Sequence, residues 1–438
     1  MYLSALLEPV AAALAGAGAP TPRGALRIGV GDAAKPAVAA ALAREAPGAV
    51  LVVVAREAHA RDLFEELSAW LGEVASGRLR RYPQRDVLPY ERSPDDPWDV
   101  RTRLETIAAL HGAGRPIVVA SVEAVAQRTL SPPAARAAVW SIAVGEGSGP
   151  DDLLRRLQAA GYEVVPLVEA PGQAARRGGI VDVFPPQAEA PARIEFFGRA
   201  VESIRLFDAA TQRSRERVQS LALGVATELS PDREQAAALL QTLDFSACDE
   251  AVAAAVREEL ATLAAGGTLA GPSFLPALLS PYSLLDHLPG EATVLLDDPT
   301  DLARALDEFV AETATMRIER EARGLLPAGL PPAQANWHDL QPKLEPLRVV
   351  ELSRFATEEA GALRPPFAPA PAFGGRIRVL ARDLSQSLRR GEAAVIVSQQ
   401  ASRLVTLLGD EGVAARAVTD RVEPAAPGVV QVLRGSLP

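Results

Sequence analysis

A run of seven apolar residues, AVLVVVA at 49–55, restricts the fold of this chain more than any other stretch. A strand that is apolar at every position is typical of a parallel sheet covered by helices on both faces, because neither face meets water. Two further apolar runs, LRIGV at 26–30 and PIVVAS at 116–121, are separated from it by helix-like segments. This alternation predicts βαβ units. We therefore assign residues 1–126 to the first half of an α/β domain.

The loop after the first run, GVGDAAKP at 29–36, is similar to a phosphate-binding loop in which key residues are changed. In the motif G-x-x-x-x-G-K-[ST], the second glycine lets the backbone approach the phosphates and the hydroxyl binds Mg²⁺. Gly29 and Lys35 fit the motif, whereas Ala34 replaces the second glycine and Pro36 replaces the hydroxyl residue. Proline neither binds a metal nor donates an N–H group. The loop thus predicts a degenerate nucleotide site.

A later strand-like run, ATVLLDDP at 292–299, carries the acids that such a site would need. In nucleotide hydrolases an aspartate at this place holds Mg²⁺. Here Asp297 is followed by Asp298, where a glutamate that polarises water is usual. Separate changes in the loop and in the acids favour an inactive site. Taken alone, the two acids are also explained as turn formers at the end of a strand.

The pattern changes in the middle of the chain. After a helix-like segment that begins at Pro150, strand-like runs follow without helices between them: YEVVPLV, GGIVDVF, ARIEFF and VESIRLF. This succession predicts a small antiparallel sheet inserted into the α/β domain. We expect the insertion at 127–212, the second half of the α/β domain at 213–350, a Pro/Ala-rich linker at 351–375 and a third small α/β domain at 376–438. The third domain is expected to be a fragment, because the chain stops soon after a strand.

Composition excludes several classes of protein. The 45 Lys and Arg against 55 Asp and Glu give a net charge of -10, which repels a phosphate backbone on average. The single cysteine, Cys248, permits no internal disulfide, and the four histidines show no metal-ligand spacing. No run approaches the length of a membrane span, and the N-terminus lacks the basic start of a signal peptide. We therefore expect a cytoplasmic protein that binds neither a membrane nor a metal.

Four longer stretches carry a resemblance to a known family: RRGGIVDVFPP at 176–186, ARIEFFGRAVESIRLFDAATQRS at 192–214, SLLDHLPGEATVLLDDP at 283–299 and YPQRDVLPYERSPDDPWDVRTRLETIAAL at 82–110. They resemble the UvrB-homology module at the N-terminus of the bacterial transcription-repair coupling factors, the Mfd family. The resemblance implies an α/β domain like the first domain of UvrB, interrupted by a UvrA-binding domain. It also implies that the nucleotide site is degenerate.

The resemblance implies a function as well. This segment would recruit UvrA, would need no cofactor and would catalyse no reaction. In the intact family protein, later domains would bind RNA polymerase stalled at DNA lesions and release it by ATP-dependent translocation on double-stranded DNA. ATP and Mg²⁺, like the contacts with RNA polymerase and DNA, would therefore belong to those later domains.

The residues that the resemblance assigns to UvrA contact are Arg177, Arg193 and Phe197. In ARIEFF, strand alternation places Ile194 and Phe196 on one face and Arg193 and Phe197 on the other. If the first pair is core, an arginine and an aromatic residue are exposed together, as at many protein interfaces. On the residues alone, the alternative is that both arginines are solvated strand residues and that Phe197 packs beneath a turn.

Two other functions compete with recruitment. One is a UvrB-type helicase or excinuclease subunit with a weak ATP site, a reading that Lys35 keeps open. UvrB carries an aromatic-rich hairpin that clamps DNA, whereas the corresponding region here has three aromatic residues only, Tyr82, Tyr90 and Trp98. The other is nonspecific DNA binding through the basic cluster at 80–85, although neighbouring acids favour a solvated face there.

Overall fold

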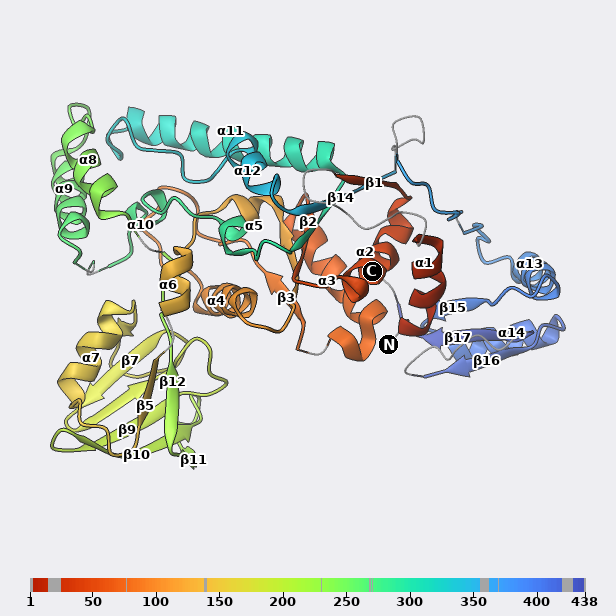
Figure 1. The fold of residues 1–438 in the computed structure, drawn as a ribbon, viewed down its shortest axis with the longest axis horizontal. Helices are drawn as coiled ribbons and strands as arrows, with labels where there is room; N and C mark the ends of the chain where they lie inside the picture. Colours follow the sequence, from red (N-terminus) through yellow and green to blue (C-terminus); the bar gives the residue numbers. More distant parts are fainter. Residues whose placement is uncertain are drawn as a thin grey trace.

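The computed structural model describes residues 3–14, 25–75, 77–137, 140–229, 231–267, 269, 271–354, 362–368, 370–419 and 428–436. A large parallel sheet forms the centre, and Figure 1 shows an antiparallel sheet and a small C-terminal sheet on opposite sides of it. The α/β class with an inserted antiparallel sheet, predicted from the sequence, is confirmed. None of the described helices combines the length and the apolar composition that crossing a membrane requires.

The central sheet has six strands in the order β1-β14-β13-β2-β4-β3, and every neighbouring pair is parallel. Every residue of β2, β4 and β13 is buried, which confirms the strands predicted from the apolar runs. The six strands are β1 (Leu26–Gly29), β2 (Val50–Val54), β3 (Leu79–Tyr82), β4 (Ile117–Ser121), β13 (Thr293–Asp297) and β14 (Arg348–Ser353).

Each face of this sheet has its own apolar core, because successive side chains of a strand point to opposite sides. In β2, for example, Leu51 and Val53 belong to one core and Val52 to the other. One face is covered by α1 (Leu7–Leu14), α2 (Lys35–Glu45) and α3 (Glu57–Leu71). The other face is covered by α4 (Pro97–His111), α5 (Val122–Ala126), α11 (Pro299–Ala322) and α12 (Trp337–Leu344).

The inserted unit contains a six-stranded sheet in the order β11-β10-β9-β8-β7-β6, antiparallel except for the parallel pair β6 and β7. One face packs on α7 (Pro150–Ala159) and on a two-stranded sheet of β5 (Trp140–Ala143) and β12 (Ser220–Leu223). The six strands are β6 (Glu163–Val164), β7 (Gln173–Arg177), β8 (Ile180–Val183), β9 (Ala192–Phe197), β10 (Ala200–Phe207) and β11 (Ser214–Val218).

The remaining elements flank these two units. Three helices, α8 (Arg233–Thr242), α9 (Glu250–Ala264) and α10 (Leu275–Leu278), form a separate apolar cluster, and α6 (Pro132–Ala137) lies before β5. The C-terminal unit has three parallel strands, β15 (Val395–Ser398), β17 (Val430–Arg434) and β16 (Ala415–Val418), with α13 (Ile377–Arg389) and α14 (Ala401–Asp410).

The domain limits expected from the sequence stay predictions. The strands of the inserted unit run from Trp140 to Leu223, so they continue beyond residue 212. Residues 355–361 and 369 of the expected linker lie outside the described residues. Within the described part of that linker, Leu363 pairs with the edge of β1, because its N–H donates to Arg27 and its carbonyl accepts from Gly29.

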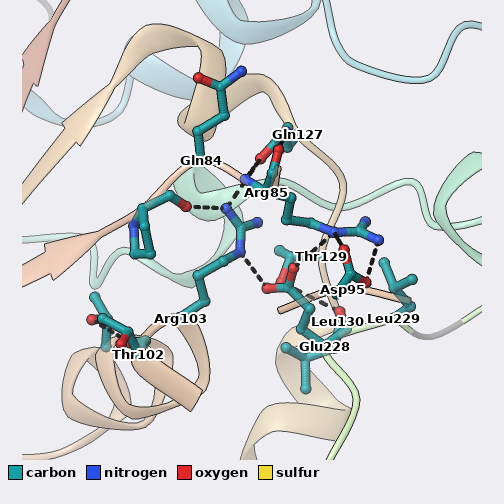
Figure 2. Close-up of polar contacts among 12 residues, drawn as sticks. Gln84, Arg85, Asp95, Thr102, Arg103, Gln127, Thr129, Leu130, Glu228 and Leu229 are labelled. Atoms are coloured by element: carbon teal, nitrogen blue, oxygen red, sulfur yellow. Dashed lines mark hydrogen bonds and ion pairs between the residues drawn. The ribbon is translucent and has the colours of Figure 1, made fainter. Parts of the chain in front are cut away.

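Arg103 on α4 is the largest of the fully buried side chains. Its Nε donates to Glu228 Oε2 at 2.6 Å, and its Nη1 donates to the Pro83 carbonyl at 2.7 Å (Figure 2). The guanidinium carbon also lies 4.0 Å from the centroid of the Tyr82 ring. Since Glu228 is 1% exposed, this is an ion pair out of contact with water, joining α4 to the segment that leaves the inserted unit.

A second arginine extends this network. Arg85 donates from Nε and Nη2 to the two carboxylate oxygens of Asp95, at 2.8 and 2.6 Å, and its Nε lies 3.5 Å from Glu228 Oε1. The Gln127 side chain accepts from the Arg85 N–H at 2.8 Å and from Arg103 Nη1 at 3.2 Å. Figure 2 shows the residues converging from several segments. The network therefore holds together the chain on both sides of the insertion.

We expect Arg103→Met to lower the free energy of unfolding by about 3 kcal/mol, because the buried carboxylate of Glu228 loses its closest charged partner and keeps only Arg85, 3.5 Å away. Urea unfolding followed by circular dichroism measures this change. The double variant Arg103→Met/Glu228→Gln removes both charges and should regain part of the loss. A cost below about 1 kcal/mol for the single variant, the range of exposed pairs, would contradict this account.

Candidate functional site

The three residues expected to contact UvrA lie on one face of the antiparallel sheet. Arg177 ends β7, and Arg193 and Phe197 belong to β9. The predicted alternation along β9 is confirmed, because Ile194 is buried and Phe196 packs against the same core. Phe197 is 81% exposed and does not pack beneath a turn. We call the surface formed by Arg177, Arg193 and Phe197 the arginine–phenylalanine face.

A buried carboxylate holds the two arginines of this face. Asp182 on β8 is 2% exposed and lies opposite Arg193 in the sheet. It accepts from Arg193 Nε at 2.7 Å and from Arg193 Nη2 at 2.8 Å, and Arg177 Nη2 donates to it at 3.3 Å. The Arg193 guanidinium also lies 4.9 Å from the centroid of the Phe207 ring. Such a bidentate pair fixes the direction of the guanidinium, while a fifth of the Arg193 side chain stays exposed.

Asp182 itself was not among the residues that the sequence pointed to. Its side chain decides which arginine is rigid, since Arg193 makes two bonds to it and Arg177, whose side chain is 55% exposed, makes one. A signal was present in the sequence, because Asp182 is an acid inside the apolar strand GGIVDVF. A charge in that setting is buried only when it is paired.

The second predicted site brings its residues together as well. Lys35 begins α2 and is 8% exposed. Its Nζ lies 2.6 Å from Asp297 Oδ1, 2.9 Å from Asp32 Oδ1 and 3.0 Å from Asp298 Oδ2. Burial lowers the pKa of the lysine, but these carboxylates, Asp297 most of all, raise it more, so the net pKa is above its usual value. Three carboxylates therefore surround the ammonium group, and it donates hydrogen bonds to two of them, those of Asp297 and Asp298.

The surroundings of Lys35 are also acidic. A cavity of about 300 Å³ beside it is lined by four carboxylate residues, Asp32, Asp62, Glu66 and Asp297, and by His59. The loop N–H of Ala34 is bonded to the Gly31 carbonyl at 2.9 Å, and Pro36 has none to offer. A triphosphate would have to displace carboxylates from Lys35 and would meet others nearby. Gly29 ends β1, where its N–H donates to the carbonyl of Leu363.

We expect Lys35 to be a structural cation. Lys35→Met should lower the free energy of unfolding by about 3 kcal/mol, because Asp297 and Asp298 lose the charge that compensates them. Calorimetric titration of the unmodified chain with ATP and Mg²⁺ should show no saturable heat. The UvrB-type reading is supported instead if ATP binds saturably and if Lys35→Met abolishes that binding without a loss of stability.

The structure brings together two histidines that the sequence left dispersed. His111 Nε2 lies 2.9 Å from His287 Nδ1, and His287 Nε2 lies 2.9 Å from the Leu130 carbonyl. Because a carbonyl only accepts, His287 carries its hydrogen on Nε2, and its Nδ1 accepts from His111. Burial lowers the pKa of His287 to about 4, and the neighbouring His111 adds to this effect. Within the described residues, no group of three His, Cys, Asp or Glu is placed to hold a metal ion.

The depressed pKa of His287 predicts a loss of stability in mild acid. In the unfolded chain His287 has an ordinary pKa near 6.5 and binds a proton below that pH, whereas in the folded chain it stays neutral down to about pH 4. The stability that His287 contributes is thus fully present above pH 6.5 and is lost as the pH falls from 6.5 towards 4. We expect urea unfolding to show a loss of about 2 kcal/mol between pH 7 and pH 5. In His287→Phe the loss over this interval should shrink, and an unchanged loss would refute the assignment.

The basic cluster at 80–85 is largely paired within the chain. Arg81 lies 3.4 Å from Glu57 and 3.9 Å from Asp99, and Arg85 belongs to the buried network around Glu228. These pairs leave little positive charge for a phosphate backbone. The nonspecific DNA-binding alternative therefore gains no support from this geometry.

Comparison with known proteins places the inserted unit in a family. A family model described as the UvrB interaction domain matches residues 140–229, which include β5 to β12 and the whole arginine–phenylalanine face. Glu228 of the buried network stands at the end of this match.

Curated relatives are similar over most of the chain. The transcription-repair-coupling factor of Myxococcus xanthus is 33% identical over 415 residues, which is 86% of this chain and 34% of that protein. Its counterpart in Bacillus subtilis is 26% identical over 94% of this chain and 36% of that protein. The one in Escherichia coli is 26% identical over 68% of this chain and 25% of that protein. The chain spans about a third or less of the length of these relatives.

Proposed function

Since the chain is homologous to the N-terminal region of the transcription-repair-coupling factors, we propose that it recruits UvrA through the arginine–phenylalanine face of its UvrB interaction domain. One observation carries the proposal: Phe197 is 81% exposed on the same sheet face as an arginine that a buried carboxylate holds in place. Aromatic residues and arginines are the usual energetic centres of protein interfaces.

The three residues divide the work of binding. Arg193, fixed by Asp182, presents its guanidinium to a carboxylate or carbonyl of UvrA. Because the side chain is already ordered, it loses little conformational entropy on binding. Phe197 buries its ring in an apolar pocket of UvrA. Arg177 makes one bond to Asp182, so its exposed side chain adapts to the partner.

The role of the intact protein follows as part of the proposal. It recognises RNA polymerase stalled at DNA lesions, releases it by ATP-dependent translocation on DNA and recruits the UvrA/UvrB excision machinery in the cytoplasm. The segment described here supplies the recruiting surface and is not the ATP hydrolase. The three carboxylates around Lys35 support this assignment, because they occupy the cation that would otherwise bind the phosphates of ATP. ATP and Mg²⁺ then act in other domains of the intact protein.

The second candidate function is a UvrB-type subunit with a weak ATP site. It is supported by the retained Lys35 and by the cavity of about 300 Å³ beside it, which is at the lower end of the size range of small-molecule sites. The ATP titration described above decides between the two candidates.

We expect UvrA to bind the purified chain, and Phe197→Ala to weaken binding by a hot-spot magnitude, on the order of 2 kcal/mol. Because the ring is exposed, this variant should unfold at the same urea concentration as the unmodified chain. Arg193→Ala should weaken binding by a similar amount but also lower stability, since it leaves Asp182 with Arg177 alone. Titration calorimetry and urea unfolding together separate the two effects.

Arg382→Ala, on α13 of the C-terminal unit, is the matched control and should bind UvrA normally. The proposal fails if the folded, unmodified chain does not bind UvrA, or if Phe197→Ala binds as tightly as the unmodified chain.

A further inference from the structure

Three arginines lie side by side across neighbouring strands of the antiparallel sheet. Arg193 on β9 is the register partner of Arg205 on β10, and Arg205 is the partner of Arg217 on β11. Directly paired residues project from the same face of a sheet. The row therefore continues the arginine–phenylalanine face as far as the edge strand, and neither Arg205 nor Arg217 was singled out from the sequence.

This row works against the stability of the sheet, because like charges directly opposite each other are destabilising. Asp182 compensates Arg193 with two hydrogen bonds. Arg205 has weaker compensation, since its Nη2 lies 3.2 Å from Glu195 while its buried Nε has no partner among the described residues. Arg217 is exposed and makes no ion pair with any residue that the structure describes. Compensation thus declines from the centre of the sheet towards its edge.

Protection of the sheet edge does not account for the row. Charged residues on an edge strand discourage pairing between sheets, which would explain Arg217 on β11. Arg205, however, lies on β10, which has a neighbour on each side. An arginine between two others in an interior position has no such protective role.

We infer that Arg205 and Arg217 extend the arginine–phenylalanine face into a strip that docks on a carboxylate-bearing surface of UvrA. This inference rests on the proposed function. Exposed Arg217, at the outer end of the strip, attracts the acidic surface during approach. Arg193, at the inner end of the row, and Phe197, at the end of the same strand, hold the complex once it has formed. Charges at the rim of an interface mainly change the association rate and its salt dependence, whereas buried anchors change dissociation.

The chemistry of the strip favours an acidic protein surface over nucleic acid. Carboxylates stand within it, since Asp182 and Glu195 are interleaved with the arginines and would repel phosphates. The exposed Phe197 supplies the apolar contact that a protein interface needs. The chain as a whole carries a net charge of -10, which opposes approach to a phosphate backbone.

The test is stopped-flow association of UvrA with the purified chain at low and high salt. Arg217→Glu should slow association on the order of tenfold at low salt, with a smaller difference at high salt, where exposed charges are screened. Arg217→Lys keeps the charge and should retain most of the rate. Arg382→Glu, the same reversal on α13, is the control for net charge and should have little effect. Arg217→Gln should not lower the urea midpoint, because the residue contributes repulsion rather than stability to the fold.

The outcomes separate this inference from the proposed function. If Phe197→Ala weakens UvrA binding while Arg217→Glu associates at the unmodified rate, the strip is refuted and recruitment stands. If neither the unmodified chain nor any variant binds UvrA, both the proposed function and the inference about the strip are refuted. If Arg217→Glu leaves UvrA association unchanged but abolishes salt-sensitive binding of the chain to duplex DNA, the strip contacts phosphates and the inference is overturned.

Discussion

The buried ion pair between Arg103 and Glu228 is the interaction on which the arrangement of the two main units depends. The chain leaves the parallel sheet after β4, forms the inserted unit and comes back to the α/β domain at Glu228. There the buried carboxylate of Glu228 pairs with Arg103 on α4. Removing the partner of a charge that is out of contact with water costs several kcal/mol. The pair therefore selects one path for the returning chain, and Arg85 and Gln127 reinforce that choice. The apolar cores on either side require burial but specify position less strictly.

The two candidate sites use the same types of side chain in opposite ways. At the carboxyl ends of the parallel strands, where α/β proteins usually bind ligands, the positive charge of Lys35 is compensated by carboxylates of the chain itself. On the inserted sheet, one carboxylate, Asp182, serves two arginines and leaves part of their charge available. In the proposed function, recognition therefore uses the partly uncompensated arginines on the face of the insertion rather than the lysine at the ends of the parallel strands.

Much of the fold could be predicted because local pattern and tertiary environment agree. The run AVLVVVA is apolar at every position because it is covered on both sides, and ARIEFF alternates because Ile194 and Phe196 face the core while Arg193 is partly exposed and Phe197 is exposed. The features that were missed depend on partners far away in the chain. Arg103 looks like any arginine of the helix PWDVRTRLETIAALH, and its partner is 125 residues away. His111 and His287 are 176 residues apart, so no spacing rule relates them.

By itself, the sequence determined the classes of the two main sheets, their order along the chain and the alternation along ARIEFF, because periodicity is a local property that each segment carries with it. The exposure of Phe197 was left open by the residues alone and was decided by the structure. Only the tertiary structure decided which charges are compensated. Lys35 is paired with three carboxylates, the guanidinium of Arg193 is held by Asp182, and the side chain of Arg217 is exposed to solvent. The physical reason is that the energy of a charge is set by its partners and its exposure to water, and both arise from strands and helices that meet only when the chain is folded.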